Sequence, residues 1–222
     1  MFGFSLPDKE KRRMRASLRE IGNIPVRSAT LEALFPHLKG KNQKVRQLER
    51  DGEVIRLKRG LYVCSAKATG VDLSAELIAN HLYAPSYVSK SSALSYYGLI
   101  PEAVYTMESM TLKHSRRFDT PLGRFEYTST DRASFPVGLR IERCVGYAFV
   151  MAGREKALCD LIAHSPGVCL RYKTDVEAYI RADIRMDWEM FLGMDPEVFA
   201  AYALVGKKPE SIRTIERVLR QR

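Results

Sequence analysis

Residues 41–63 read KNQKVRQLERDGEVIRLKRGLYV. Their first half predicts a helix over Lys41–Asp51 in which Val45 and Leu48 share one side. The opposite side carries four side chains suited to reading base edges in the major groove: Gln43, Arg46, Gln47 and Arg50. Two lysines are expected to flank this face and contact phosphates: Lys41 and Lys44. The pattern is typical of a recognition helix, although a solvated helix face has a similar composition.

The second half of this stretch predicts a β-hairpin. Asp51-Gly52 is a turn signal, and Val54–Leu57 and Leu61–Val63 have the composition of strands. Between them, Gly60 can take the positive φ that a tight connection needs. Three cations on the hairpin are predicted to lie along DNA phosphates, as the wing of a winged helix does: Arg56, Lys58 and Arg59.

Two more helices are predicted before residue 41. The first begins at Leu6-Pro7-Asp8, and its inward side chains recur at helical spacing: Met14, Leu18 and Ile21. The second is short, with Ser28 as its N-cap and three inward side chains: Leu31, Leu34 and Phe35. Three helices followed by a basic hairpin predict a winged helix-turn-helix DNA-binding domain over residues 1–66.

The charge distribution supports a polyanionic partner. The chain of 222 residues carries a formal charge of +10. Residues 1–66 hold 15 Lys and Arg against seven Asp and Glu, a net charge of +8. The corresponding net charges are −2 for residues 67–206 and +4 for residues 207–222. A basic head and a basic tail on a near-neutral body favour nucleic acid as the partner, with an anionic membrane surface as the second choice.

Residues 67–222 predict a second domain, of mixed α+β structure. Helices are expected over 73–82, capped by Asp72, and over 91–97. Strands are expected over 87–89, 107–112, 124–128, 139–144 and 147–151. Helices follow over 154–164, 175–185, 187–192, 196–205 and 209–220. The last helix has an apolar face and a basic remainder that either forms a second nucleic-acid surface or belongs to a plain packing helix: Lys207, Lys208, Arg213, Arg217 and Arg220. The whole chain is therefore expected to be an α+β protein with a helical end.

No catalytic, metal or cofactor site is predicted. Asp160 and His164 lie four residues apart on one helix, a spacing more typical of an ion pair or a cap than of a catalytic dyad. Glu155-Lys156 lacks the upstream acidic partner of a metal nuclease, and no phosphate-binding loop or hydrolase motif occurs. The four cysteines show no CxxC spacing, and the chain shows no export signal and no membrane-spanning run. We expect a cytoplasmic protein that is not an enzyme and has no membrane partner.

Three stretches, in this order, resemble the AbiEi-type antitoxins of type IV toxin–antitoxin systems, which act in abortive infection. They are LERDGEVIRLKRGLYV at residues 48–63, YVSKSSALSYYGL at residues 87–99 and AGREKALCDL at residues 152–161. The first is shared with many winged helices, whereas the ordered combination of the three is more specific. Several residues in the second and third stretches also have the spacing of ordinary core positions.

The resemblance implies a transcriptional repressor that binds double-stranded DNA at the operator of its own operon. It also implies that the second domain counters a nucleotidyltransferase-like toxin, an antagonism that does not require a stable complex with it. Two alternatives remain at this stage: a winged-helix transcription factor without a toxin partner, and a nucleic-acid-processing enzyme. The identity of the neighbouring gene would separate the first alternative from an antitoxin, and an acidic metal cluster would indicate the second.

Overall fold

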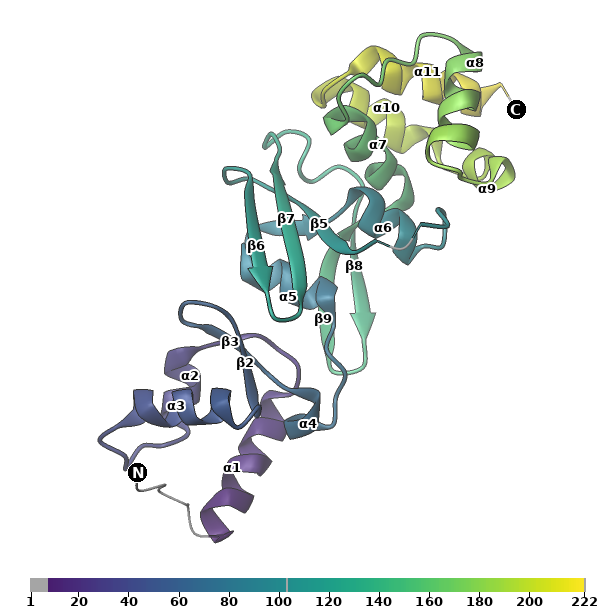
Figure 1. Ribbon diagram of the computed structural model, residues 1–222. Coiled ribbons are helices and arrows are strands. Elements are labelled where there is room, and N and C mark those ends of the chain that lie inside the picture. The colour runs from purple at the N-terminus through teal and green to yellow at the C-terminus, as the bar shows by residue number, and fades with distance from the viewer. Residues whose placement is uncertain (1–7, 103, 222) are drawn as a thin grey trace. The chain divides into compact units, whose positions relative to one another are not determined.

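A computed structural model describes residues 8–102 and 104–221, and it shows an α+β protein (Figure 1). The chain divides into two compact units. One contains the chain up to Leu82 together with residues 120–122, and the other contains residues 83–119 and 123–222. The predicted start of the first helix at Leu6 and Pro7 lies outside the described residues. No helix in the described part of the chain is long and apolar enough to cross a membrane.

The first unit contains the predicted three helices and hairpin. Its elements are, in order, α1 (Asp8–Ile21), β1 (Val26–Arg27), α2 (Ser28–Ala33), α3 (Lys41–Arg50), β2 (Val54–Lys58), β3 (Leu61–Cys64), α4 (Ala66–Thr69) and α5 (Ala75–Leu82). The hairpin β2–β3 is antiparallel, and β1 pairs with β3 from its other side. Gly60 lies at the hairpin turn with φ +78°, as expected there.

Side chains from α1, α2, α3 and the hairpin form one core. The predicted inward residues Leu18, Leu31 and Phe35 lie in it with Val45 and Leu48. Ser28 does not act as the predicted N-cap, because Arg27 occupies the N-cap position and no side chain caps α2. Phe35 is buried although α2 ends before it, at Ala33.

The packing boundary of the first unit lies at Leu82, beyond the predicted junction at residue 66. Ala68 of α4 belongs to the core of the first unit, and α4 packs against α1. The Asn23 side chain donates a hydrogen bond to the backbone oxygen of Asp72 at 3.0 Å. The small polar residues after residue 65, which read as a domain junction, therefore form a capped turn of helix held to α1.

The second unit is built on a six-stranded sheet with the order β6-β7-β5-β4-β9-β8. The strands are β4 (Ser86–Val88), β5 (Thr106–Thr111), β6 (Arg116–Thr120), β7 (Gly123–Ser129), β8 (Leu139–Cys144) and β9 (Tyr147–Ala152). β5 pairs with β7, and β4 with β9, in parallel, whereas the β4–β5 and β8–β9 pairs are antiparallel. β6 and β8 are the edge strands.

Helices complete the second unit. They are α6 (Lys90–Tyr96), α7 (Arg154–His164), α8 (Lys173–Ala178), which continues as a π-helix (Tyr179–Asp183), α9 (Trp188–Leu192), α10 (Pro196–Val205) and α11 (Pro209–Arg220). α6 packs against α7, and α10 packs against both α7 and α11. The single helix predicted over 175–185 is therefore an α-helix followed by a π-helix. The N-cap of α5 is Ser74 and not the predicted Asp72, because the Ser74 Oγ accepts a hydrogen bond from the Leu77 N–H.

Candidate nucleic-acid interface

The outward side of α3 is polar and basic. Val45 and Leu48 are 2% and 1% exposed and anchor the helix in the core of the first unit. The opposite side exposes four side chains to solvent: Asn42, Gln43, Arg46 and Arg50. Because residues four apart lie on the same side of a helix, Asn42, Arg46 and Arg50 form a row along it. Among residues 14–102 and 104–221, neither arginine of this row has a carboxylate within ion-pair distance.

Lys44 does not lie on the predicted flank of this face. It is buried, its Nζ donates to Gln47 Oε1 at 3.0 Å, and the same nitrogen lies 5.9 Å from the centre of the Phe35 ring. The reason is geometric, since position 44 lies one turn before Leu48 on the same side of the helix. Gln47 is half-buried as the partner of Lys44, and Lys41 is half-buried at the start of the helix. Lys44 is therefore removed from the set of surface phosphate contacts.

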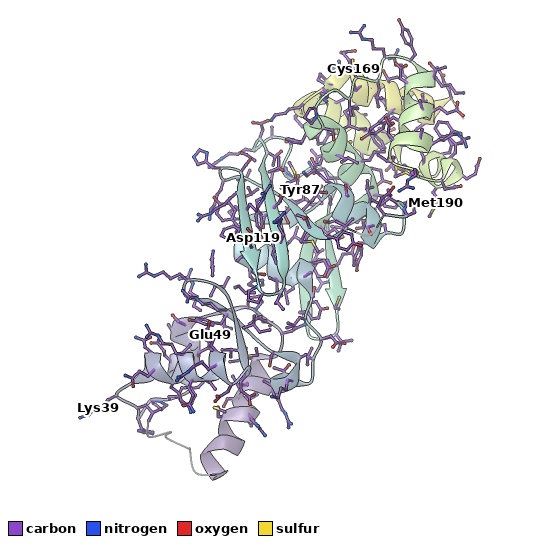
Figure 2. The ribbon with its side chains drawn as sticks, viewed as in Figure 1. Lys39, Glu49, Tyr87, Asp119, Cys169 and Met190 are labelled. Atoms are coloured by element: carbon purple, nitrogen blue, oxygen red, sulfur yellow. The ribbon has the colours of Figure 1, made fainter. Side chains whose placement is uncertain are left out.

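Two exposed residues extend the face beyond the predicted set. Asn42 lies in the row with Arg46, and its amide can form the paired hydrogen bonds that recognise adenine. Lys39 precedes α3 and points to solvent from the turn between α2 and α3 (Figure 2). The helical spacing of Asn42 from Arg46 and Arg50 was a usable signal for the first residue. Lys39 lies outside any periodic segment, so only the structure locates it.

The hairpin presents two of its three predicted cations. Arg56 on β2 and Arg59 at the turn are exposed. Lys58 is half-buried, and its Nζ donates to the backbone oxygen of Leu82 at 2.5 Å. A register irregularity between Arg56 and Lys58 shifts the side chains at the end of β2. The Lys58 ammonium thus has a partner within its own unit, whereas the guanidinium groups of Arg56 and Arg59 face solvent.

The basic residues of the C-terminal helix are largely engaged inside the second unit. Lys208 donates to the backbone oxygens of Ser165 and Val168, at 2.5 and 2.8 Å. Arg213 pairs with Glu210 at 2.6 Å. Arg220 contacts Glu216 and Glu197 at 2.9 and 2.8 Å, and Arg217 donates to Thr214 Oγ1 at 3.0 Å.

The other face of α11 packs into the unit. It does so through four buried side chains: Ile212, Ile215, Val218 and Leu219. Lys207 is exposed just before the helix. This arrangement is that of a packing helix in which Arg213 and Arg220 are ion-paired, in contrast to the open arginines of α3.

A second polar cluster lies deep in the second unit. Lys156 and Asp160 of α7 form an ion pair at 3.1 Å, and both side chains are fully buried. Three hydroxyl groups also donate to the Asp160 carboxylate: Tyr87 at 2.9 Å, Ser89 at 2.7 Å and Tyr202 at 3.1 Å. Figure 2 places Tyr87 inside this unit.

Both charges of this cluster have partners inside the protein. Lys156 Nζ donates to the backbone oxygen of Ser134 at 2.8 Å and lies 4.5 Å from the centre of the Tyr202 ring. Burial raises the pKa of Tyr87 and Tyr202 far above that of a free tyrosine, and the neighbouring Asp160 carboxylate adds to the shift. A fully hydrogen-bonded buried ion pair of this kind links β4, α7 and α10, and it presents no group to a substrate.

Neither sequence pair considered for catalysis forms a site. His164 Nδ1 lies 3.1 Å from the backbone oxygen of Asp160, not from its carboxylate, so the two do not form a dyad. Glu155 accepts from the Asp195 N–H at 3.3 Å at the start of α10, while Lys156 points into the buried cluster. In the described part of the chain, no group of three or more His, Cys, Asp or Glu residues is arranged to hold a metal ion.

Comparisons with known proteins inform the fold. No protein-family model matches the sequence, and no curated protein shows significant sequence similarity to it. The crystal structure of the RV2827C protein from Mycobacterium tuberculosis is similar, with a TM-score of 0.51 and 12% sequence identity. The match covers 98% of this chain and 83% of that chain. At this identity the likeness concerns the fold alone.

Proposed function

We propose that the first unit binds double-stranded DNA as a winged helix-turn-helix, with α3 in the major groove and the β2–β3 hairpin along the adjacent phosphates. The observation that carries this proposal is the open row Asn42, Arg46 and Arg50 on α3, opposite a buried apolar side. Arginine reads guanine and asparagine reads adenine through paired hydrogen bonds. Because no carboxylate of the described chain neutralises the two arginines, their donors are available to a polyanion.

The hairpin and the turn before α3 supply the sequence-independent part of this binding. Three cations are exposed here: Arg56 in β2, Arg59 at the hairpin turn and Lys39 in the turn before α3. Contacts of this type position a protein on the duplex without distinguishing sequences. Their combination with the polar row of α3 is the division of labour expected of a repressor.

The biological role we propose is that of an autorepressor and antitoxin of a type IV toxin–antitoxin system. This part rests on the three stretches that resemble the AbiEi-type antitoxins. The first unit would repress the operon, and the second unit would counter the nucleotidyltransferase-like toxin. A gene for such a toxin beside the gene for this chain would support the antitoxin role. Its absence would favour a transcription factor acting alone.

The DNA-binding proposal is tested with the full chain and the duplex promoter upstream of its own gene. Affinity is measured by fluorescence anisotropy at a series of salt concentrations, with a scrambled duplex of the same composition as control. Each phosphate contact contributes roughly −0.9 to the slope of log affinity against log salt, so contacts from Lys39, Arg56 and Arg59 give a slope of about −2.7. Equal affinity for promoter and scrambled duplex would exclude sequence reading, and a flat salt response would exclude phosphate contacts.

The antitoxin proposal needs a separate test in cells. The full chain and a variant with the α3 row removed (Asn42→Ala, Arg46→Ala, Arg50→Ala) are each expressed from an independent promoter beside the neighbouring toxin gene. Both proteins are expected to rescue growth, because repression and antagonism are assigned to different units. Loss of rescue in the α3 variant would show that the two activities are not divided in this way.

A further inference from the structure

Three aromatic rings of the second unit form a cluster beside the edge strand β6. Tyr83 precedes β4, Phe118 lies on β6 and Tyr127 lies on β7. The ring centres are 5.5 Å apart for Tyr83 and Phe118, 5.2 Å for Tyr83 and Tyr127, and 5.7 Å for Phe118 and Tyr127. Tyr127 is buried, whereas Tyr83 and Phe118 are half-buried, so this cluster reaches the surface.

Two cations lie against these rings. Lys113 Nζ is 5.1 Å from the centre of the Tyr83 ring. The guanidinium carbon of Arg116 is 4.8 Å from the centre of Phe118 and 5.9 Å from that of Tyr83. Both distances are within the range of cation–π contacts. We name Lys113 and Arg116 with Tyr83 and Phe118 the β6 aromatic surface.

The two faces of the β6–β7 ribbon differ in how their charges are used. On one face Arg117 pairs with Glu126 at 2.8 Å, and Asp119 pairs with Arg124 at 2.9 Å. Side chains alternate along a strand, so Arg116 and Phe118 lie on the other face. There, Lys113 and Arg116 are exposed, and no carboxylate of the described residues lies within ion-pair distance of either.

Protection of an edge strand accounts for only part of this arrangement. Charged side chains on an edge strand prevent pairing with another sheet, and Arg117 would serve that purpose as well as Arg116. It does not account for aromatic rings that hold two uncompensated cations in place. Ordering these long side chains before binding reduces the entropy that a partner must overcome, which favours a ligand with both negative charge and flat apolar groups.

We propose that the β6 aromatic surface binds single-stranded nucleic acid. Unpaired bases stack on aromatic rings and on arginine guanidinium planes, and they are accessible only where the strand is not base-paired. Arg116, held beside Phe118, would stack on a base, and Lys113 would contact a neighbouring phosphate. This binding is separate from duplex recognition by α3, because it uses the other unit and another form of nucleic acid.

The test is a titration of the full chain with fluorescein-labelled 20-nucleotide strands of mixed sequence, one of RNA and one of DNA. Arg116→Ala is expected to weaken binding of the preferred strand roughly tenfold, the effect of losing one stacking contact. The matched control, Arg117→Ala, removes the same charge from the opposite face and is expected to change affinity less than twofold. Arg116→Lys keeps the charge without the planar group and is expected to be intermediate. Thermal unfolding of each variant checks that the fold is intact.

Three results would overturn the proposal. The first is an equal loss of affinity in Arg116→Ala and Arg117→Ala, which would indicate general charge attraction. The second is displacement of the labelled strand by unlabelled random duplex as efficiently as by unlabelled strand, which would place the binding on the duplex-reading face. The third is retention on phosphatidylserine vesicles without binding to either oligonucleotide, which would identify a membrane surface. Because these titrations need no promoter duplex, their outcome is distinguishable from failure of the proposed function.

Discussion

Arg46 of α3 and Lys156 of α7 are both basic residues on helices, but their surroundings differ completely. Arg46 is exposed, with Asn42 and Arg50 one turn away on either side and no carboxylate of the described residues in reach. Lys156 is fully buried, paired with Asp160 and hydrogen-bonded to a backbone oxygen. The first arrangement leaves charge available for a partner, and the second uses its charge to hold three elements together. A basic residue thus indicates binding only when the structure leaves it without compensation.

The C-terminal helix lies between these two cases. Its arginines are exposed like Arg46, but Arg213 and Arg220 pair with glutamates on α10 and α11. Counting cations makes this helix look like a second binding surface, whereas its pairing makes it close to neutral. Four measurements test whether charges that are open, ion-paired or buried differ in this way.

The largest effect is expected in the buried cluster around Lys156 and Asp160. Lys156→Met leaves the Asp160 carboxylate buried without its counter-charge, and breaking such a pair costs about 3–5 kcal/mol of unfolding free energy. Urea denaturation measures this loss. Arg154→Met on the same helix, where the side chain is 43% exposed, serves as the control and is expected to change stability little. A small effect of Lys156→Met would mean that the cluster does not hold the second unit together.

The next effect concerns the sequence reading that we propose for α3. A good paired contact to a base contributes roughly 1–3 kcal/mol of discrimination, so Arg46→Ala is expected to lower promoter affinity about tenfold to a hundredfold. Affinity for scrambled duplex should fall much less. Asn42→Ala is expected to relax discrimination at one A·T pair. Arg213→Ala, on the paired helix, is the control and should leave both affinities unchanged. Equal losses on both duplexes would show that α3 does not read bases.

A smaller difference is expected between two neighbouring cations of the hairpin. Arg59→Ala removes an exposed charge, so affinity for promoter and scrambled duplex should fall by the same few-fold factor. Lys58→Ala removes the hydrogen bond to Leu82, so its main effect should be a stability loss of about 1 kcal/mol. Duplex titration and thermal unfolding of both variants separate the two roles. A larger loss of affinity in Lys58→Ala than in Arg59→Ala would assign the phosphate contact to Lys58.

The smallest effect is expected at His164, whose Nδ1 lies beside the backbone oxygen of Asp160. Burial lowers the pKa of this imidazole, although its hydrogen bond to the Asp160 backbone oxygen opposes the shift. Below about pH 6.5 the unfolded chain therefore binds a proton that the folded chain does not, and stability should decrease until His164 is protonated in the folded state as well. His164→Gln should flatten the stability curve below about pH 6.5. Identical curves for the two proteins would assign the pH dependence to other groups.

The elements of the first unit were predictable because their signals are local. The apolar positions Leu18, Leu31, Val45 and Leu48 recur at helical spacing, and all four are buried as expected. The hairpin followed from Asp51-Gly52 and from the need for positive φ at Gly60. The α+β class followed in the same way, from the alternation of strand-like and helical stretches.

Local periodicity did not predict two short strands, β1 and β6. β1 has two residues and exists because Val26 pairs with Tyr62. β6 lacks an apolar alternation, since its sequence is Arg-Arg-Phe-Asp-Thr, and it forms beside β7 at the edge of the sheet. The partner of β1 is distant in sequence, whereas β6 pairs with the adjacent β7 although its own five residues carry no strand pattern.

Residue type and helical spacing were enough to place Arg46 and Arg50 opposite an apolar side of their helix. Which charges remain open depended on the packing of the folded chain. It buried Lys44 against Phe35, attached Lys58 to Leu82 and surrounded Asp160 with donors from Tyr87 and Tyr202. The physical reason is that compensation of a charge depends on groups distant in sequence, and burial makes compensation obligatory. An exposed charge such as that of Arg46 needs no partner within the protein.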